Sequence, residues 1–296
     1  MSWCLCLIQA FIPTRVFKAG FIMSGIIGIL GGIGPWGHIA FEQQLLAQAG
    51  KAKREQDYPA WLLLSLPSIP DRTAALLEGG PSPVPMLLWG LQQLAMIADL
   101  AVVPCITAHA FYPEFSAKAG LPILHLIDAT ILHLASLVSD GSTIGLLATT
   151  GTLRCELFPK AARRLGANLR WLSLLDLPDG ESLQEQLFMQ PIYGHPVAGG
   201  LRYGGIKNGF VQDPYLKQSY RVVLDAAGQR LRAAGADLLV AGCSELSLAM
   251  SPSPWLIDPL AIAAREASVQ AQATATRASH RIPCPSQPPL ACPETR

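Results

Sequence analysis

Two parts of the chain repeat one pattern, and this internal repeat constrains the fold more than any other feature. Residues 98–100 and 236–238 both read Ala-Asp-Leu, and each triplet begins a short apolar run. A cysteine follows the aspartate by six residues in both copies, as Cys105 and Cys243. A recurrence of this kind indicates that one structural unit occurs twice in the chain.

The repeat extends upstream to two glycine turns. Residues 27–30 (Ile-Gly-Ile-Leu) lead to Gly34, and residues 144–147 (Ile-Gly-Leu-Leu) lead to Gly151, six residues after the glycine of each run. Short, fully apolar runs are typical of strands in a parallel sheet that is buried on both faces. We therefore predict an α/β fold: two pseudo-symmetric three-layer α/β lobes with mainly parallel sheets and a cleft between them.

The boundaries of the two lobes can be placed from the same pattern. Residues 24–122 and 256–271 are expected to form lobe 1, which carries Cys105, and residues 123–255 to form lobe 2, which carries Cys243. Residues 1–22 do not fit the pattern, and we expect either a disordered extension or translation that starts at Met23. Residues 272–296 are rich in Pro, Ser, Ala and Arg and are expected to be a disordered tail.

Composition excludes several classes of protein. Half of the 296 residues are hydrophobic, which suffices for a large core, and the net charge of +1 provides no basic surface for nucleic acid. The apolar run at residues 3–12 is too short to span a bilayer, so we expect no membrane partner. The seven cysteines are an odd number without paired zinc-finger spacing, which favours free thiols in a reducing, cytoplasmic compartment.

The repeated cysteines lie where a parallel sheet binds ligands. Both follow the end of a predicted strand, and ligands of open α/β sheets sit at the carboxyl ends of the strands. A single buried cysteine is usually a small hydrophobic residue without chemistry. A second copy at the equivalent position favours a chemical role for Cys105 and Cys243.

The first glycine turn permits two interpretations. Gly32, Gly34 and Gly37 match G-x-G-x-x-G, the fingerprint of dinucleotide-binding folds. That fingerprint requires an acidic residue about 20 positions later, and the next predicted strand (residues 61–66) lies too far along the chain. A tight turn whose backbone N–H groups bind a substrate carboxylate is the better interpretation.

Several polar residues have both a structural and a functional interpretation. Asp71 either caps a short helix at 73–77 or faces the cleft. His109 follows Cys105 by four residues and is either a base or a packed polar residue. Lys207 is isolated in a Gly-rich turn, and a lysine in such a turn is usually a solvent-exposed surface residue. Thr149, Thr150 and Thr152 surround Gly151 and could donate hydrogen bonds to an anion.

Five short motifs occur in order over residues 25–270 and are specific when taken together. They are Gly-Gly-Ile-Gly-Pro at 31–35, Ile-Pro-Asp-Arg-Thr at 69–73, Pro-Cys-Ile-Thr-Ala-His at 104–109, Leu-Ala-Thr-Thr-Gly-Thr at 147–152 and Gly-Cys-Ser-Glu at 242–245. In this order they resemble the aspartate/glutamate racemase family of cofactor-independent amino-acid racemases with two catalytic cysteines.

The resemblance implies an activity and a set of site residues. It implies two α/β lobes facing a cleft, no pyridoxal phosphate, no metal, a small amino-acid substrate and a homodimer. It implies that Cys105 and Cys243 are the two bases. The supporting residues would be Asp71, Lys207, Glu245 and His109, and the substrate-binding residues Gly32, Gly34, Arg72, Thr107, Thr149, Thr150, Thr152 and Ser244.

Two cysteines suit this reaction because racemisation removes a proton from one face of Cα and returns a proton to the other. Bases on opposite faces achieve this, and pseudo-symmetric lobes would place them so. The thiolate is the reactive form, and its pKa falls near cations such as Arg72 or Lys207 and near helix N-termini. The second cysteine must stay a thiol to donate its proton, so the pair is expected to titrate unequally.

The chain departs from the family pattern at several positions. Ile106 stands where the family usually has Asn, and Leu66 lies in a neighbourhood that usually contains another Asn. An apolar side chain cannot replace amide hydrogen bonds to a carboxylate, which are worth about 1.5–3 kcal/mol. The segment at 195–203 is also longer than the usual spacing in the family.

The choice between aspartate and glutamate as substrate therefore stays open. Two alternative functions also stay open: a relative that uses one Cys for decarboxylation or isomerisation, and an inactive amino-acid-binding protein.

Overall fold

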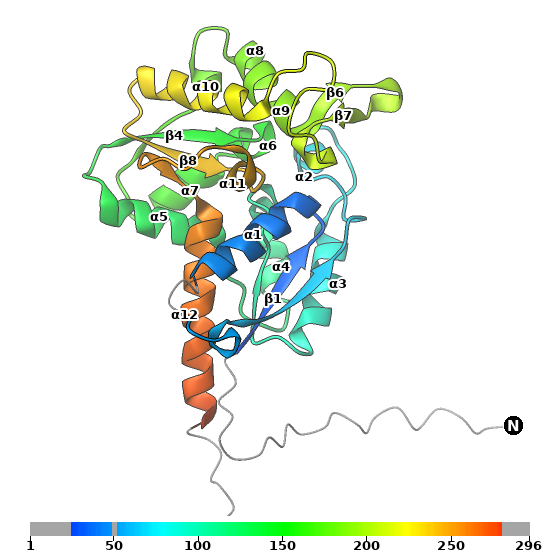
Figure 1. The fold of residues 1–296 in the computed structure, drawn as a ribbon, viewed down its shortest axis with the longest axis vertical. Helices are drawn as coiled ribbons and strands as arrows, with labels where there is room; N and C mark the ends of the chain where they lie inside the picture. The colour runs from blue at the N-terminus through cyan, green and yellow to red at the C-terminus, as the bar shows by residue number, and fades with distance from the viewer. Residues whose placement is uncertain (1–24, 49–51, 280–296) are drawn as a thin grey trace, which may run out of the picture.

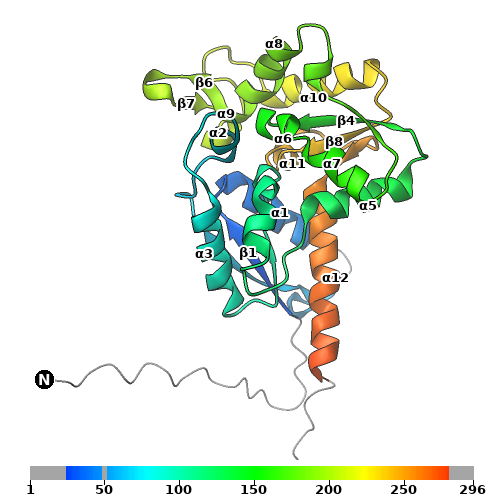
Figure 2. The same cartoon turned by 180° about the vertical axis from the view of Figure 1, so that it is seen from behind.

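A computed structural model describes residues 25–48 and 52–279 (Figures 1 and 2). The predicted extension at 1–22, the expected start at Met23 and the part of the predicted tail from residue 280 onward lie outside the described residues. Two sheets lie one above the other in Figure 1, and helices cover both faces of each sheet. The predicted α/β fold with two lobes and parallel sheets is confirmed.

The first lobe is built on three parallel strands in the order β2-β1-β3. The chain forms β1 at Ile26–Gly31, β2 at Ala60–Ser65 and β3 at Leu100–Val102. Ile123 extends this sheet by an isolated parallel bridge to Ala101. The central strand β1 is buried almost throughout, as a strand covered on both faces must be.

The second lobe repeats this order with four parallel strands, β5-β4-β8-β9. They are β4 at Thr143–Ala148, β5 at Arg170–Leu172, β8 at Leu238–Gly242 and β9 at Leu256–Ile257. β4 takes the central place of β1, β8 that of β3, and β9 that of the Ile123 bridge. The repeat in the sequence is therefore also a repeat of the strand order.

The aspartate of the repeated triplet has the same role in both lobes. Asp99 accepts a hydrogen bond from the N–H of Ile26 at 2.7 Å, and Asp237 accepts one from the N–H of Thr143 at 2.8 Å. Each aspartate also donates its own N–H to the carbonyl of that same residue, at 2.9 and 2.7 Å. Each central strand is thus fixed at its start to the strand that leads to a cysteine.

The alanine of the triplet packs against a glycine of the central strand. A Cβ atom added to Gly28 would lie 2.9 Å from the Cβ of Ala98, and one added to Gly145 would lie 3.1 Å from the Cβ of Ala236. Both separations are shorter than ordinary van der Waals contact, so a side chain at either position would force its neighbours to shift.

Helices form the outer layers of each lobe. α3 (Val84–Ala95) covers one face of the first sheet, and α1 (Pro35–Gln48) with α12 (Pro259–Ser279) covers the other. In the second lobe α10 (Tyr220–Ala233) lies above β4 and β8 in Figure 1, and α5 (Leu126–Leu137) and α7 (Leu157–Arg164) lie below them. The other elements are α2 (Arg72–Leu77), α4 (Tyr112–Ser116), α6 (Thr150–Arg154), α8 (Gly180–Gln184), α9 (Gln190–Tyr193), α11 (Leu246–Ala249), β6 (Gly194–Pro196) and β7 (Arg202–Gly204).

One hydrophobic core joins the two lobes. Ile27 and Ile29 of β1 and Ile144 and Leu146 of β4 belong to the same buried cluster, together with residues of α1, α5, α7 and α12. The other face of each sheet has a separate cluster, with Leu30 in the first lobe and Leu147 in the second. The alternation along each strand sends neighbouring side chains to opposite faces.

The structure shifts the expected lobe boundaries. Ile123, expected in lobe 2, pairs with the first sheet, and Leu256–Ile257, expected in lobe 1, pair with the second. α12 also continues to Ser279 and does not end near residue 271. Its alanines favour a long helix, and Ala263, Ala264 and Ala267 are fully buried against the common core. Within residues 25–48 and 52–279, no helix has the length and hydropathy needed to cross a membrane.

We expect the two aspartates of the repeat to stabilise the fold unequally. Asp99→Ala removes a part-buried hydrogen bond and is expected to lower the free energy of unfolding by about 1–2 kcal/mol, whereas Asp237→Ala removes an exposed one and should cost about half as much. Urea denaturation measures both values, with the exposed Asp140→Ala as control. Equal effects of all three substitutions would show that these bonds do not fix the strands.

Candidate active site

The two cysteines of the repeat lie at equivalent strand ends. Cys105 follows β3 and Cys243 follows β8, and both side chains are buried, with 5% of each residue exposed. Cys155, the third cysteine of the described residues, lies between α6 and α7. Because β3 and β8 occupy equivalent places in their sheets, each lobe contributes one thiol at the carboxyl edge of its sheet.

Three threonine hydroxyl groups join the lobes beside Cys105. The hydroxyl of Thr107 in the first lobe lies 3.0 Å from the hydroxyls of both Thr149 and Thr152 in the second, and all three residues are buried. Thr149 also caps α6, accepting the N–H of Thr152. Thr150 is only partly buried, and its N–H faces the sulfur of Met189. The hydroxyls are thus held together without a charged partner.

The glycine turns allow the lobes to approach closely. A Cβ atom on Gly34 would lie 3.0 Å from Oε1 of Glu245, and one on Gly37 would lie 2.6 Å from the hydroxyl of Ser244. A Cβ atom on Gly151 would lie 3.0 Å from the hydroxyl of Thr73. Gly34 and Gly37 of the G-x-G-x-x-G match therefore provide contact between the lobes, which accounts for these two glycines without a nucleotide.

Gly32 shapes the start of the same turn. Its φ of +89° is in the left-handed region, and an added Cβ would lie 2.4 Å from the N atom of Leu66. Its N–H donates to Nδ1 of the buried His38 at 3.1 Å. Sequence reasoning did not identify this role of His38, because the bond depends on how α1 begins.

A buried carboxylate lies at the centre of the second half of the site. Glu245 has no exposed surface, and its Oε1 accepts a hydrogen bond from Nζ of Lys207 at 3.0 Å. Its Oε2 accepts the thiol of Cys243 at 2.9 Å and the hydroxyl of Ser244 at 3.1 Å. Lys207, expected by default on the surface, has a side chain that is only 16% exposed.

The charges in this group determine the state of the thiol. Burial raises the pKa of Cys243 well above its ordinary value, and the carboxylate of Glu245 raises it further. Burial disfavours the ammonium of Lys207, but Glu245 outweighs this effect, so the pKa of Lys207 is raised. The pKa of Glu245 is lowered, because Lys207 and the hydrogen bonds outweigh burial. The group therefore contains an ion pair and a protonated Cys243 at neutral pH.

Arg72 has the corresponding position next to Cys105. It is buried, and it donates from Nη2 to the carbonyl of Ile33 at 3.1 Å and from Nη1 to that of Pro70 at 3.2 Å. Its Nε has no partner among the described residues. Burial opposes its charge, but Cys105 and Asp71 outweigh this and raise the pKa of Arg72. Arg72 is thus a fixed cation with a spare donor beside the first thiol.

Asp71 and Tyr193 connect the two halves. Asp71 accepts the N–H of Ala74 at 2.9 Å as the cap of α2, and its other oxygen accepts the hydroxyl of Tyr193 at 3.4 Å. The Tyr193 hydroxyl also lies 3.3 Å from that of Thr73, and its ring lies 5.1 Å from Nζ of Lys207. Burial raises the pKa of Tyr193 to about 12. The capping interpretation of Asp71 is confirmed, and its bond to Tyr193 links it to the second lobe, whereas Tyr193 was not identified from the sequence.

His109 has a structural environment. Its Nδ1 lies 3.0 Å from the carbonyl of Cys105, and its Nε2 accepts the N–H of Leu126 at 3.2 Å. Burial lowers the pKa of His109 to about 3. The ring is therefore neutral at neutral pH and adds no positive charge next to Cys105. His109 therefore holds the backbone of Cys105 to that of Leu126 through its two ring nitrogens.

The apolar departures from the family pattern are part of the core. Ile106 is 2% exposed and belongs to the cluster shared by the two lobes. Leu66 packs against the cluster of the first lobe, where it contacts the position of Gly90. Both side chains therefore have apolar packing partners in the core of the protein.

The long segment after Tyr193 forms a small antiparallel hairpin of β6 and β7. Nε2 of His195 lies 2.5 Å from Oδ2 of Asp213, and Nδ1 of His195 lies 2.6 Å from Nε2 of Gln190. Asp213 also accepts the N–H groups of Tyr215 and Leu216. These hydrogen bonds join His195 and Asp213, which lie on either side of Lys207 in the sequence, and so hold both ends of the segment 195–213 in place.

The model of the Asp/Glu/hydantoin racemase family matches residues 30–189, more than half of the 296 residues. The chain belongs to this family. The match begins in β1 and includes the first glycine turn, Arg72, Cys105 and the threonine cluster. It ends before Lys207 and Cys243, so the case for these two residues as part of the candidate site rests on their geometry alone.

Individual relatives agree with this membership. The chain is 25% identical over 153 residues to the broad-specificity amino-acid racemase RacX of Bacillus subtilis, an alignment that covers 48% of this chain and 62% of that protein. The chain thus spans less than two thirds of that relative's length. In structure it is similar to Picrophilus torridus aspartate racemase, with a TM-score of 0.64, 24% identity and coverage of 83% and 94% of the two chains. An aspartate racemase homologue from Pyrococcus horikoshii gives a TM-score of 0.59 at 19% identity, with 83% and 99% covered.

We predict that Glu245→Gln makes Cys243 ionise more easily. The substitution removes the negative charge that raises the thiol pKa and leaves Lys207 nearby. The midpoint of the pH dependence of iodoacetamide alkylation at Cys243, followed by peptide mass spectrometry, should fall by about one to two pH units. Ser244→Ala, which keeps the carboxylate, is the control and should leave it unchanged. An unaltered midpoint in Glu245→Gln would contradict the assigned charge.

We also predict that His109 destabilises the protein in acid. The folded-state pKa of His109 is lowered to about 3, whereas the ordinary value is 6.5. Between these values the unfolded chain binds a proton that the folded chain does not, so stability is lost as pH falls below about 6.5. In His109→Gln the free energy of unfolding should decline less between pH 7 and pH 5 than in the wild type. His133→Gln, at a more exposed site, is the control, and parallel curves for His109→Gln and wild type would contradict the prediction.

Proposed function

We propose that the protein is a cofactor-independent amino-acid racemase, an isomerase that interconverts L and D enantiomers by proton transfer at Cα between Cys105 and Cys243. The observation that carries the proposal is the pair of buried thiols, one from each lobe at equivalent strand ends, each with a cation in its group. Family membership and the racemase activity in the name of the Bacillus subtilis relative support the same class of reaction.

The two thiols are suited to different starting roles. Cys105 has the buried cation Arg72 as its neighbour and would act as the base that removes the Cα proton. Cys243 is held as a thiol beside Glu245 and would donate its proton to the opposite face. Reaction in the other direction begins with the opposite protonation states, as microscopic reversibility requires.

The same residues suit a carboxylate-bearing substrate. The hydroxyls of Thr107, Thr149 and Thr152 lie within hydrogen-bond distance of one another and could donate to an α-carboxylate instead. Arg72 has a free Nε–H in a buried position, which is costly unless a ligand completes it. A second carboxylate on the substrate would complete it, so aspartate or glutamate is the preferred substrate class.

Of the alternatives, the geometry disfavours chemistry at a single cysteine. Both thiols are equally buried, and each has its own charged neighbour. A passive binding protein would not need a carboxylate to hold Cys243 protonated. A two-base racemase is therefore the function that accounts for all of these side chains.

The proposed function is tested by replacing each thiol. Cys105→Ala and Cys243→Ala should each reduce the racemisation of aspartate and glutamate by at least about 10³-fold, because each removes an obligatory proton-transfer group. Chiral chromatography of the products measures the rates. Cys155→Ala, outside the site, is the control and should keep the wild-type rate. Near-wild-type racemisation in either test variant would refute the mechanism.

Arg72 is predicted to discriminate substrates by charge. Arg72→Gln should raise KM for the preferred dicarboxylic amino acid by roughly 10- to 100-fold, since a charge-assisted hydrogen bond is lost. The Cys105 base would also weaken, so kcat should fall as well. Exposed Arg163→Gln serves as control. An unchanged KM together with an unchanged kcat would remove Arg72 from the site.

A further inference from the structure

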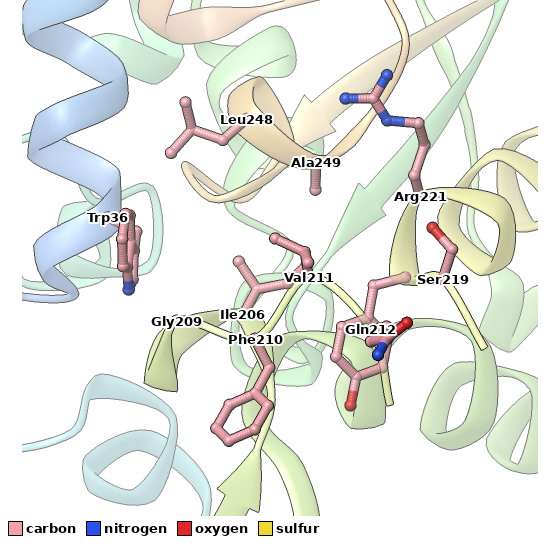
Figure 3. Close-up of a pocket in the computed structure, with 11 residues that line it drawn as sticks. Trp36, Ile206, Gly209, Phe210, Val211, Gln212, Ser219, Arg221, Leu248 and Ala249 are labelled. Atoms are coloured by element: carbon pink, nitrogen blue, oxygen red, sulfur yellow. The ribbon is translucent and has the colours of Figure 1, made fainter. Parts of the chain in front are cut away.

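A cavity lies beside the candidate active site, and neither Cys105 nor Cys243 lines it. It has a volume of about 300 Å³, within the size range of small-molecule sites. Figure 3 shows Trp36 on one side, Leu248 and Ala249 above, and residues of the segment from 206 to 221 on the other side. The proposed racemase reaction makes no use of this cavity.

The walls of the cavity are mostly apolar. Trp36 is 39% exposed and Val211 82% exposed, which are large fractions for side chains of this kind. Ile206, Phe210 and Leu248 complete the apolar lining. Exposed apolar side chains around a concave surface indicate that an apolar ligand or partner can bind there and cover them.

The polar groups of the cavity are gathered at its α10 end and carry a positive charge. Ser219, the residue before α10, forms no capping hydrogen bond, and the first turn of α10 contains no acidic residue. Arg221 lies on the rim above Ser219 in Figure 3. Among the residues that the structure describes, Arg221 takes part in no ion pair, and Asp225, one turn along the helix, accepts hydrogen bonds from Ser251. An anion would therefore be favoured at this end.

The residues that line the cavity belong to the same chain segments as residues of the candidate active site. Trp36 follows Gly34, which contacts Glu245. Ile206 and Gly209 flank Lys207 in the same short turn. The N–H groups of Leu248 and Ala249 both donate to the carbonyl of Glu245. A ligand in the cavity would thus contact residues that lie directly beside Lys207 and Glu245, the two members of the ion pair.

From these features we infer that the cavity is a second, regulatory binding site for an aromatic monocarboxylic acid. The aromatic body would lie against Trp36 and Phe210, and the carboxylate would bind Arg221 at the start of α10. The binding does not depend on the proposed function, whereas the regulation rests on it. A small dicarboxylic amino acid has no apolar body to bury here, so the two sites would select different ligands.

Binding is tested by calorimetry on the full chain with 3-phenylpropionate as the probe. We expect saturable binding that is at least about tenfold weaker for 3-phenylpropan-1-ol, which has the same body without the charge. Arg221→Gln should weaken probe binding by a similar factor, and Arg230→Gln, at the other end of α10, should not. Ala249→Phe, which fills the cavity, should abolish binding while the melting temperature shows that the variant is folded.

The outcomes separate this site from the active site. Binding that survives in Cys243→Ala and is not displaced by aspartate or glutamate supports a distinct site, even if those amino acids are not racemised. A change in kcat at saturating substrate would support the regulation. Displacement by substrate, equal binding of acid and alcohol, or no effect of both Arg221→Gln and Ala249→Phe would overturn the inference.

Discussion

The contact of Thr107 with Thr149 and Thr152 is the interaction on which the site depends. It joins the carboxyl edges of the two sheets through buried hydroxyl groups that hydrogen-bond to one another, and Thr149 also accepts the N–H of Thr152. The glycine turns permit this contact because they have no side chains to separate the lobes. Each sheet delivers its cysteine at the same edge, and the proposed two-base reaction requires that this contact bring both thiols to one substrate.

Charge differs between the two halves although the backbone repeats. Cys243 has a buried carboxylate within hydrogen-bond distance, and Cys105 has a buried guanidinium instead. Pseudo-symmetry therefore extends to strand order, to the aspartates that start the strands and to the thiols, but not to the neighbours of the thiols. This asymmetry would allow one thiol to accept a proton while the other donates one.

Much of the fold could be predicted from the sequence because it is encoded locally. The apolar runs, the Ala-Asp-Leu triplets and the strand-end cysteines each occupy a few consecutive residues, and their recurrence indicated two α/β units. Asp71 and the threonines could be named because capping and turn patterns are also local. Partners set by tertiary contact could not be predicted. Lys207 and Glu245 were named only through the family resemblance, because the local sequence of Lys207 indicates a surface residue, and Tyr193 and the pair of His195 with Asp213 depend on how the hairpin packs.

The central claim is that two thiols act on opposite faces of one Cα atom, and isotope distribution in D2O tests it most directly. Each enantiomer of aspartate and of glutamate is incubated with the enzyme, and deuterium at Cα is measured early in the reaction in both product and remaining substrate. The account predicts that the product carries solvent deuterium while the remaining substrate carries almost none. Transfer of the original proton to the product, or equal labelling of both enantiomers from the start, would contradict it.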